Sequence, residues 1–238
     1  MSFRNLRMTF IFPMIIGVYC SLFLYIFAGV SNGFIQRPEP KVFARIEAQE
    51  FDDSKLFSDI TEDNSDIILE HFRNPEYSEW VINFFSGICL NADIAQAILN
   101  SSDNFNISPA LTFALCWEES RFNPNAINRQ NRNGSIDRGL FQLNDRSFPN
   151  LEIITFYNIN HNAHHGIGYL RHCLDSSDSI ISALAMYNAG AGRIKSTGAP
   201  EVTLNYISRI LDNRDKIESR FNSRLIYENE MRFITASR

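Results

Sequence analysis

Apolar side chains recur at intervals of three and four residues along most of the chain after residue 77, a spacing that places them on one face of a helix. The clearest helix starts at Ser108 and Pro109, which match an N-cap residue and a proline at the first helical position. In the segment that follows, ALTFALCWEES, apolar residues cover nearly the whole circumference, which predicts a buried helix. Further helices are expected over residues 78–90, 91–99, 162–174, 179–188 and 201–212.

A small β element interrupts this helical pattern. Asn133 and Gly134 form a turn signal, and the run Gly139–Leu143 behind them predicts a short strand, so that a β-hairpin is expected here. The predicted fold class is therefore mainly α, a helical domain with a small β-hairpin element. The charged stretch from Asp212 onward is expected to extend the last helix.

An uncharged apolar segment lies near the N-terminus. Residues 8–30 carry no charged side chain, and a helix of that length rises about 34 Å, enough to cross a bilayer core. Arg4 and Arg7 precede it, which predicts that the N-terminus stays in the cytoplasm and that the rest of the chain is exported. We expect a retained single-pass anchor in residues 1–30; the alternatives are a signal cleaved near Ser31–Gly33, or lipidation at Cys20.

Residues 31–76 are predicted to be an acidic spacer between this anchor and a domain that spans 77–238. Residues 46–80 contain eleven Asp and Glu against two Lys and Arg, which is typical of a solvated segment. Within it, Ile67–Leu69 and Phe72 are expected to form a short helix that packs on the domain.

Composition excludes several classes of function. The formal net charge is -5 and no basic stripe stands out, so nucleic acid is not an expected partner. Of the four cysteines, Cys20 lies in the apolar segment, and the other three are too widely spaced for a zinc site of paired cysteines. We expect Cys89, Cys116 and Cys173 to be buried thiols.

Two adjacent carboxyl groups, Glu118 and Glu119, lie at the end of the predicted buried helix. A carboxyl group in apolar surroundings has a raised pKa and can donate a proton near neutral pH, as cleavage of a glycosidic bond requires. Helical geometry alone does not choose between the two residues. Taken without other motifs, the pair would more often be a solvated helix end.

The motifs around this pair resemble the active-site region of the lysozyme-like superfamily, most closely the lytic transglycosylases with a soluble-lytic-transglycosylase (SLT) domain. Those proteins share a Glu-Ser pair, an aromatic residue and a proline, a Gly-Leu-x-Gln segment and an Ala-x-Tyr-Asn-Ala-Gly segment, in that order. The matching residues here are Glu119-Ser120, Phe122, Pro124, Gly139–Gln142 and Ala185–Gly190. The resemblance covers residues 91–212, and the combined order and spacing make it specific.

This resemblance implies a bacterial enzyme that cleaves the bond between N-acetylmuramic acid (MurNAc) and N-acetylglucosamine (GlcNAc) in peptidoglycan. Glu119, which directly precedes Ser120, would be the acid and then the base, and the product would carry a 1,6-anhydro-MurNAc end. Ser120 and Gln142 would orient substrate, and the hydroxyl of Tyr187 would hydrogen-bond the catalytic Glu. Asn188 and Tyr206 would form cleft walls. The domain would lie in the periplasm, tethered to the inner membrane or released after signal cleavage.

Asp137 leaves a second activity open. The segment Asn133–Gly139 also resembles the hairpin of animal-type lysozymes that supplies a second carboxylate. Those enzymes are the type case of retaining glycoside hydrolysis. A hydrolytic muramidase that uses Glu119 and Asp137 is therefore an alternative to the transglycosylase. A non-catalytic module that grips glycan strands for a wall-remodelling assembly is another. Without a role in catalysis, Asp137 would simply cap the turn.

The proposed chemistry requires no cofactor, and no metal is expected. His161, His164, His165 and His172 could share a helical face, but their spacing matches no established metal pattern and no Asp or Glu lies among them. We therefore interpret them as part of a solvated helix.

Overall fold

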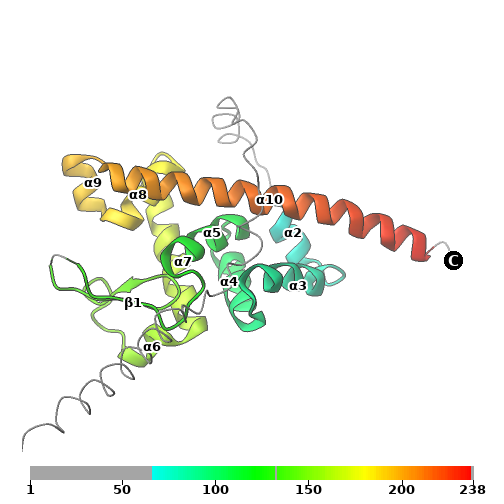
Figure 1. Ribbon diagram of the computed structural model, residues 1–238, viewed down its shortest axis with the longest axis horizontal. Coiled ribbons are helices and arrows are strands. Elements are labelled where there is room, and N and C mark those ends of the chain that lie inside the picture. Colours follow the sequence, from blue (N-terminus) through cyan, green and yellow to red (C-terminus); the bar gives the residue numbers. More distant parts are fainter. Residues whose placement is uncertain (1–65, 132, 237–238) are drawn as a thin grey trace, which may run out of the picture. The chain divides into compact units, whose positions relative to one another are not determined.

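The computed structural model describes residues 66–131 and 133–236, which form a helical unit with a small sheet (Figure 1). The predicted anchor at residues 8–30 and most of the predicted spacer lie outside the described residues. The helices are α2 (Ile67–Arg73), α3 (Ser78–Cys89), α4 (Ala92–Phe105), α5 (Pro109–Ser120), α6 (Ile153–Tyr157), α7 (Ile159–Asp175), α8 (Ile180–Ala189), α9 (Ala191–Thr197) and α10 (Glu201–Ala236).

The predicted buried helix is confirmed as α5, against which α4 and α10 pack. Every residue from Pro109 to Trp117 is buried, because α5 has neighbours on all sides. The helix ends at Arg121, whose φ of 55° lies in the left-handed region. Ser108 is the N-cap residue of α5, as expected, but its hydroxyl makes no cap hydrogen bond.

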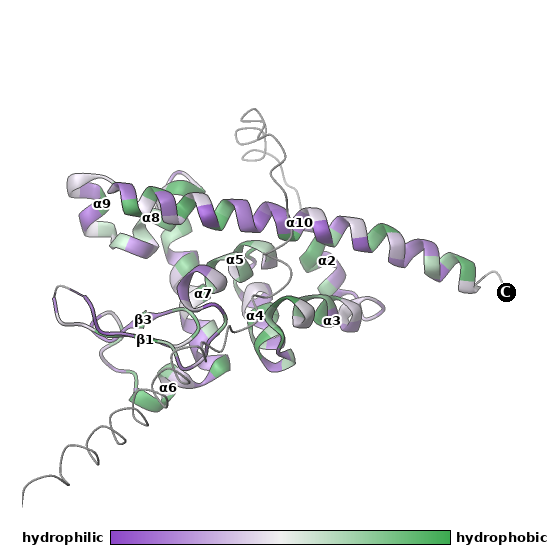
Figure 2. Ribbon diagram, in the orientation of Figure 1, coloured by the Kyte–Doolittle hydropathy of each residue, from purple (hydrophilic) through white to green (hydrophobic). Residues whose placement is uncertain are grey.

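The last helix runs from Glu201 to Ala236, so the predicted extension of the 201–212 helix beyond Asp212 is confirmed. It extends because its apolar face continues. Ile217, Phe221 and Leu225 repeat at four-residue intervals and are buried, and they prolong the face that begins at Tyr206 and Ile210. Figure 2 shows apolar and polar residues interspersed along α10, which crosses above α5 and α2. The contact of α10 with the rest of the domain thus extends to Leu225.

Other local predictions agree with the structure. Helix α8 is capped by the hydroxyl of Ser179 and stops at Gly190, as predicted. The short helix expected near Ile67 is present as α2, and Ile68 and Leu69 are buried. The three described cysteines are free, buried thiols. Helices α6 and α9, of five and seven residues, were not predicted because they are too short to show a periodic pattern.

The β element is a three-stranded antiparallel sheet in the order β1-β2-β3: β1 (Ile127–Asn128), β2 (Asp137–Arg138) and β3 (Leu143–Asn144). The strand predicted over Gly139–Leu143 is wrong, because residues 139–142 form turns and only Leu143 is in a strand. Leu140 and Phe141 are consecutive and both fully buried. A strand would point these two consecutive side chains to opposite faces, whereas the observed turn buries both of them in the helical core.

Asn162 of α7 fixes this turn to the helical core. Its buried side chain accepts a hydrogen bond from the N–H of Phe141 at 2.8 Å. Its amide nitrogen donates to the carbonyl oxygens of Arg138 at 3.0 Å and Phe156 at 2.7 Å. One side chain therefore satisfies three buried backbone groups and holds β2 and the following turn beside α7.

Within residues 66–131 and 133–236, no single helix is both long and apolar enough to cross a membrane. The sharply bent pair α3 and α4, at 119°, meets that criterion jointly by length and composition.

Candidate active site

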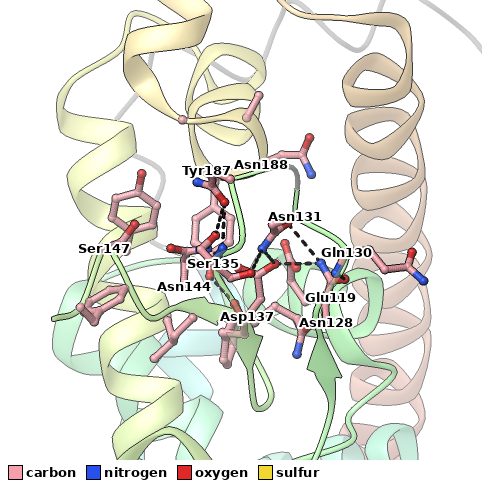
Figure 3. A pocket seen from close by; sticks show the side chains of 18 of the residues that line it. Glu119, Asn128, Gln130, Asn131, Ser135, Asp137, Asn144, Ser147, Tyr187 and Asn188 are labelled. Carbon is pink, nitrogen blue, oxygen red and sulfur yellow. Dashed lines mark hydrogen bonds between the residues drawn. The ribbon is translucent and has the colours of Figure 1, made fainter. Parts of the chain in front are cut away.

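A cleft of about 900 Å³ lies between the small sheet and helices α7 to α9, with the end of α5 in its lining (Figure 3). The side chains that line it come from segments far apart in the sequence. They are Glu119, twelve residues from Asn128 to Phe148, Tyr169, five residues from Tyr187 to Arg193, and Val202. The packing of α5, α7, α8 and the sheet therefore creates a site that no single segment contains.

Glu119 lines this cleft, as the sequence predicts. It is partly buried and accepts a hydrogen bond on Oε1 from the hydroxyl of Tyr206 at 2.5 Å. Burial raises the pKa of Glu119 to about 8, and the negative charges of Asp137 and Glu118 also raise this pKa, whereas the Tyr206 hydrogen bond lowers it. At neutral pH the carboxyl group is therefore mostly protonated and able to donate a proton.

The structure separates the two adjacent glutamates, which the helical pattern could not. The Glu118 carboxylate binds the Nε of Arg209 on α10 at 2.7 Å and a guanidinium nitrogen of Arg121 at 3.5 Å. Its side chain is 6% exposed and does not line the cleft. Glu118 is thus an ion-pair partner of α10, and Glu119 is the carboxyl group that faces the cleft.

The two tyrosines have the opposite arrangement to the one predicted. The hydroxyl of Tyr187 donates to the carbonyl oxygen of Phe141 at 3.1 Å, and the hydroxyl of Tyr206 reaches Glu119. Tyr206 is buried rather than a cleft wall, because α10 lies directly against α5 and carries it to the carboxyl group. Tyr187 lines the cleft instead.

Asp137 also lines the cleft, and three asparagine side chains surround its carboxylate (Figure 3). The amide nitrogens of Asn128, Asn131 and Asn144 donate to it at 2.9, 2.8 and 2.6 Å. The register of the sheet places Asn128 and Asn144 directly opposite Asp137. These asparagines were missed, although the hairpin register could have indicated two of them.

Among the other predicted site residues, Gln142 and Asn188 line the cleft and Ser120 does not. The amide of Gln142 donates to the carbonyl oxygen of Gly139 at 2.9 Å, and Asn188 accepts from the hydroxyl of Thr203 at 2.8 Å. The hydroxyl of Ser120 donates to the carbonyl oxygen of Cys116 at 3.3 Å, one turn earlier in α5. Ser120 is therefore bound to its own helix rather than directed at substrate.

The lining as a whole is rich in uncharged polar and aromatic side chains. Its amide side chains are Asn128, Gln130, Asn131, Asn133, Gln142, Asn144 and Asn188, and its aromatic side chains are Phe141, Phe148, Tyr169 and Tyr187. The rings of Phe148 and Tyr169 lie 6.3 Å apart, and those of Tyr169 and Tyr187 lie 5.3 Å apart. Phe148 and Tyr169 were not predicted, because neither lies in a segment that carries a motif.

The histidines of α7 make aromatic contacts. His164 packs on Phe105 at 4.9 Å, and His165 packs on the cleft residue Phe148 at 5.8 Å between ring centroids. Burial lowers the pKa of His165, and the nearby charges of His164 and His161 lower it further. In the part of the chain that the structure describes, no three His, Cys, Asp or Glu residues are grouped to hold a metal ion.

The described residues thus form a mainly helical domain with a small sheet and a partly buried glutamate in a cleft. Residues 96–207 match the family model described as the transglycosylase SLT domain. The resemblance to SLT domains seen in the sequence is thereby confirmed for this part of the chain.

A solved structure of the lytic transglycosylase Slt from Pseudomonas aeruginosa, an inactive mutant, is also similar, with a TM-score of 0.44 and 18% identity. The similarity covers 65% of this chain and 30% of that one. The chain thus matches less than a third of the length of that protein.

Proposed function

We propose that this protein is a peptidoglycan lytic transglycosylase that cleaves the β-1,4 bond between MurNAc and GlcNAc and leaves a 1,6-anhydro-MurNAc end. The observation that carries the proposal is Glu119, a partly buried carboxyl group in the cleft whose pKa is raised to about 8. It belongs to the part of the chain that matches the SLT family. A protonated acid at neutral pH is what departure of a sugar oxygen requires.

In the proposed mechanism, Glu119 first donates its proton to the glycosidic oxygen, and the bond from that oxygen to C1 of MurNAc breaks. The 6-hydroxyl oxygen of the same MurNAc then bonds to C1, while its proton passes to the Glu119 carboxylate. The acid is thereby restored and no water is consumed. The Tyr206 hydroxyl at 2.5 Å stabilises the carboxylate form between the two steps.

The cleft lining supports a glycan substrate. Seven amide side chains offer neutral donors and acceptors for sugar hydroxyl and N-acetyl groups, and Phe148 and Tyr169 offer apolar ring faces. The described lining contains a single cationic side chain, so a polyanion would find little compensation there.

Product analysis tests the proposal directly. Purified sacculi digested with the protein are expected to yield muropeptides with 1,6-anhydro-MurNAc ends, which mass spectrometry distinguishes from reducing ends by the mass of one water. Products that all carry the added water would overturn the transglycosylase in favour of a hydrolytic muramidase.

One observation favours keeping that hydrolase as the second candidate. Asp137 lines the same cleft as Glu119, and three asparagine side chains donate hydrogen bonds to its side-chain oxygens. A carboxylate opposite a protonated acid is the arrangement that retaining glycosidases use. The same digest therefore decides between the two activities.

The assignment of Tyr206 leads to a pH prediction. Tyr206→Phe removes the hydrogen bond that lowers the pKa of Glu119, so this pKa rises. The alkaline limb of kcat/KM, expected near pH 8 for a required acid, should move to higher pH. We expect kcat to fall about tenfold, because the Glu119 carboxylate formed after proton donation is less stabilised without this hydroxyl. Rates of anhydro-muropeptide release across pH 5–10 measure both effects.

Tyr187→Phe is the matched control, since its hydroxyl donates to the Phe141 carbonyl oxygen and not to Glu119. We expect its alkaline limb to stay in place. A shift in the Tyr187→Phe profile alone would return the role to that residue.

We also propose that residues 8–30 anchor the protein in the bacterial inner membrane and that the SLT domain acts in the periplasm. The uncharged length of this segment and the preceding Arg4 and Arg7 support this orientation. Peptidoglycan would then be within reach of a membrane-tethered domain.

A further inference from the structure

Arg193 of α9 is the one cationic side chain among the described residues that line the cleft. Other arginines near the site are occupied: Arg209 pairs with Glu118, and Arg138 pairs with Asp145 at 3.0 Å. Arg193 is exposed and has no ion-pair partner in the described parts of the chain. Its guanidinium group is therefore available to a bound molecule.

The position of Arg193 is fixed by the packing of its helix. Ala191 and Ile194 pack against the buried cluster of Cys173, Ala183 and Met186, which anchors one side of α9. The preceding corner is held by the hydrogen bond from Thr203 to Asn188. Arg193 thus projects from an anchored short helix beside the cleft, not from a free loop.

A guanidinium group is suited to bind a carboxylate through paired hydrogen bonds, and its charge is not needed for neutral sugar hydroxyls. In a glycan strand of peptidoglycan, carboxylates lie on the lactyl substituent of MurNAc or on the peptide attached to it. GlcNAc carries none. An unpaired cation in a cleft that otherwise offers neutral amides therefore distinguishes one sugar from the other.

We propose that Arg193 is a specificity-determining residue that binds a carboxylate carried by the lactyl or peptide substituent of MurNAc. The inference rests on the proposed function, because it names the group of the same substrate that the cleft recognises. Arg193 contacts the substituent and takes no part in proton transfer.

The test compares the full-length protein, purified in detergent, with its Arg193→Gln variant on three strand preparations. The first carries tripeptide stems with free carboxylates. The second has been stripped by an amidase, so that only lactyl carboxylates remain. The third carries tripeptide stems whose carboxylates are blocked as methylamides. Lys195→Gln is the matched control, because Lys195 is an exposed cation of α9 that does not line the cleft.

On the first preparation, Arg193→Gln is expected to raise KM about three- to tenfold with kcat nearly unchanged, the pattern of lost binding that is equal in ground and transition states. Wild type should lose the same factor when the carboxylates are blocked, and Arg193→Gln should lose nothing further, since the two changes remove one interaction. On strands with stems the lactyl carboxyl group is held in the amide bond to the peptide, so an effect on the first preparation assigns a peptide carboxylate. An effect of Arg193→Gln on stripped strands assigns the lactyl carboxylate.

Equal KM values for wild type, Arg193→Gln and Lys195→Gln on both the first and the second preparation would overturn the inference and leave the proposed function intact. If wild type releases no product from any strand, the proposed function fails. Binding of the three preparations by Glu119→Gln, with and without Arg193→Gln, then still tests carboxylate recognition. Equal dissociation constants with and without Arg193→Gln on every preparation would overturn carboxylate recognition by Arg193.

Discussion

Glu119→Gln is expected to reduce release of anhydro-muropeptides from sacculi by about 10³-fold or more, since the side chain supplies both the proton donor and the proton acceptor. Glutamine keeps the size and hydrogen-bonding shape of the protonated acid but has no proton to transfer. The initial rate at saturating substrate, followed by mass spectrometry, measures the loss. Residual cleavage near wild-type rates would sink both the acid assignment and the catalytic function based on it.

Glu118→Gln is the matched control for this loss. Glu118 has the same side chain one position earlier, but it pairs with Arg209 and does not line the cleft. Its replacement weakens an ion pair to α10 and should leave most of the cleavage rate. If Glu118→Gln is the more damaging of the two, the assignment of the acid is reversed.

The stability of Glu119→Gln separates lost chemistry from lost folding. The pKa of Glu119 is about 8 in the folded protein against an ordinary value of 4.5. Above pH 4.5 the unfolded chain releases this proton before the folded one does, so wild type loses stability as pH rises toward 8. The glutamine variant avoids this, and its free energy of unfolding at pH 8 should exceed that of wild type by on the order of 3 kcal/mol. Below pH 4.5 the difference should vanish.

Gly139→Ala is expected to have the largest effect on folding. Gly139 has a φ of 78°, and an added Cβ would lie 2.2 Å from both the Asn162 amide nitrogen and the Phe156 carbonyl oxygen. Relief of that overlap requires Asn162 to move, which breaks its hydrogen bonds to the backbone of Phe141 and Phe156. Strain and unpaired buried groups together should lower the free energy of unfolding by about 3 kcal/mol or more, and cleavage should fall as Gln142 and Asp137 shift.

Urea unfolding of the variant measures the loss, and Gly87→Ala provides the comparison. Gly87 lies within α3, and a Cβ there would meet nothing within 4 Å. Because alanine favours helix, Gly87→Ala should be neutral or stabilising by up to about 1 kcal/mol. Equal unfolding midpoints for the two variants would show that the contact at Gly139 is relaxed in solution.

Much of the helical framework could be predicted because it depends on short-range patterns. The start of α5 at Pro109, the cap of α8 at Ser179 and its stop at Gly190 each depend on a few neighbouring residues. The strand expected over Gly139–Leu143 failed because adjacent apolar residues permit either a strand or a buried turn, and the pocket formed by α7 favours the turn. The extension of α10 beyond Asp212 was expected, but not that its four-residue apolar repeat, embedded in charged residues, would pack along the domain.

Glu119 of the Glu-Ser pair shows most clearly which features the sequence determined and which ones depend on the tertiary structure. The sequence by itself determined a buried helix that ends in two carboxyl groups, and the ordered motifs pointed to Glu119. Only the tertiary structure decided that Glu118 faces Arg209, and that Tyr206, 87 positions away in the sequence, reaches Glu119 in place of Tyr187. It also placed three amides around Asp137 and Arg193 in the cleft lining. Helix periodicity and caps act within a few residues, whereas these contacts exist only once α10, α9 and the sheet pack around α5.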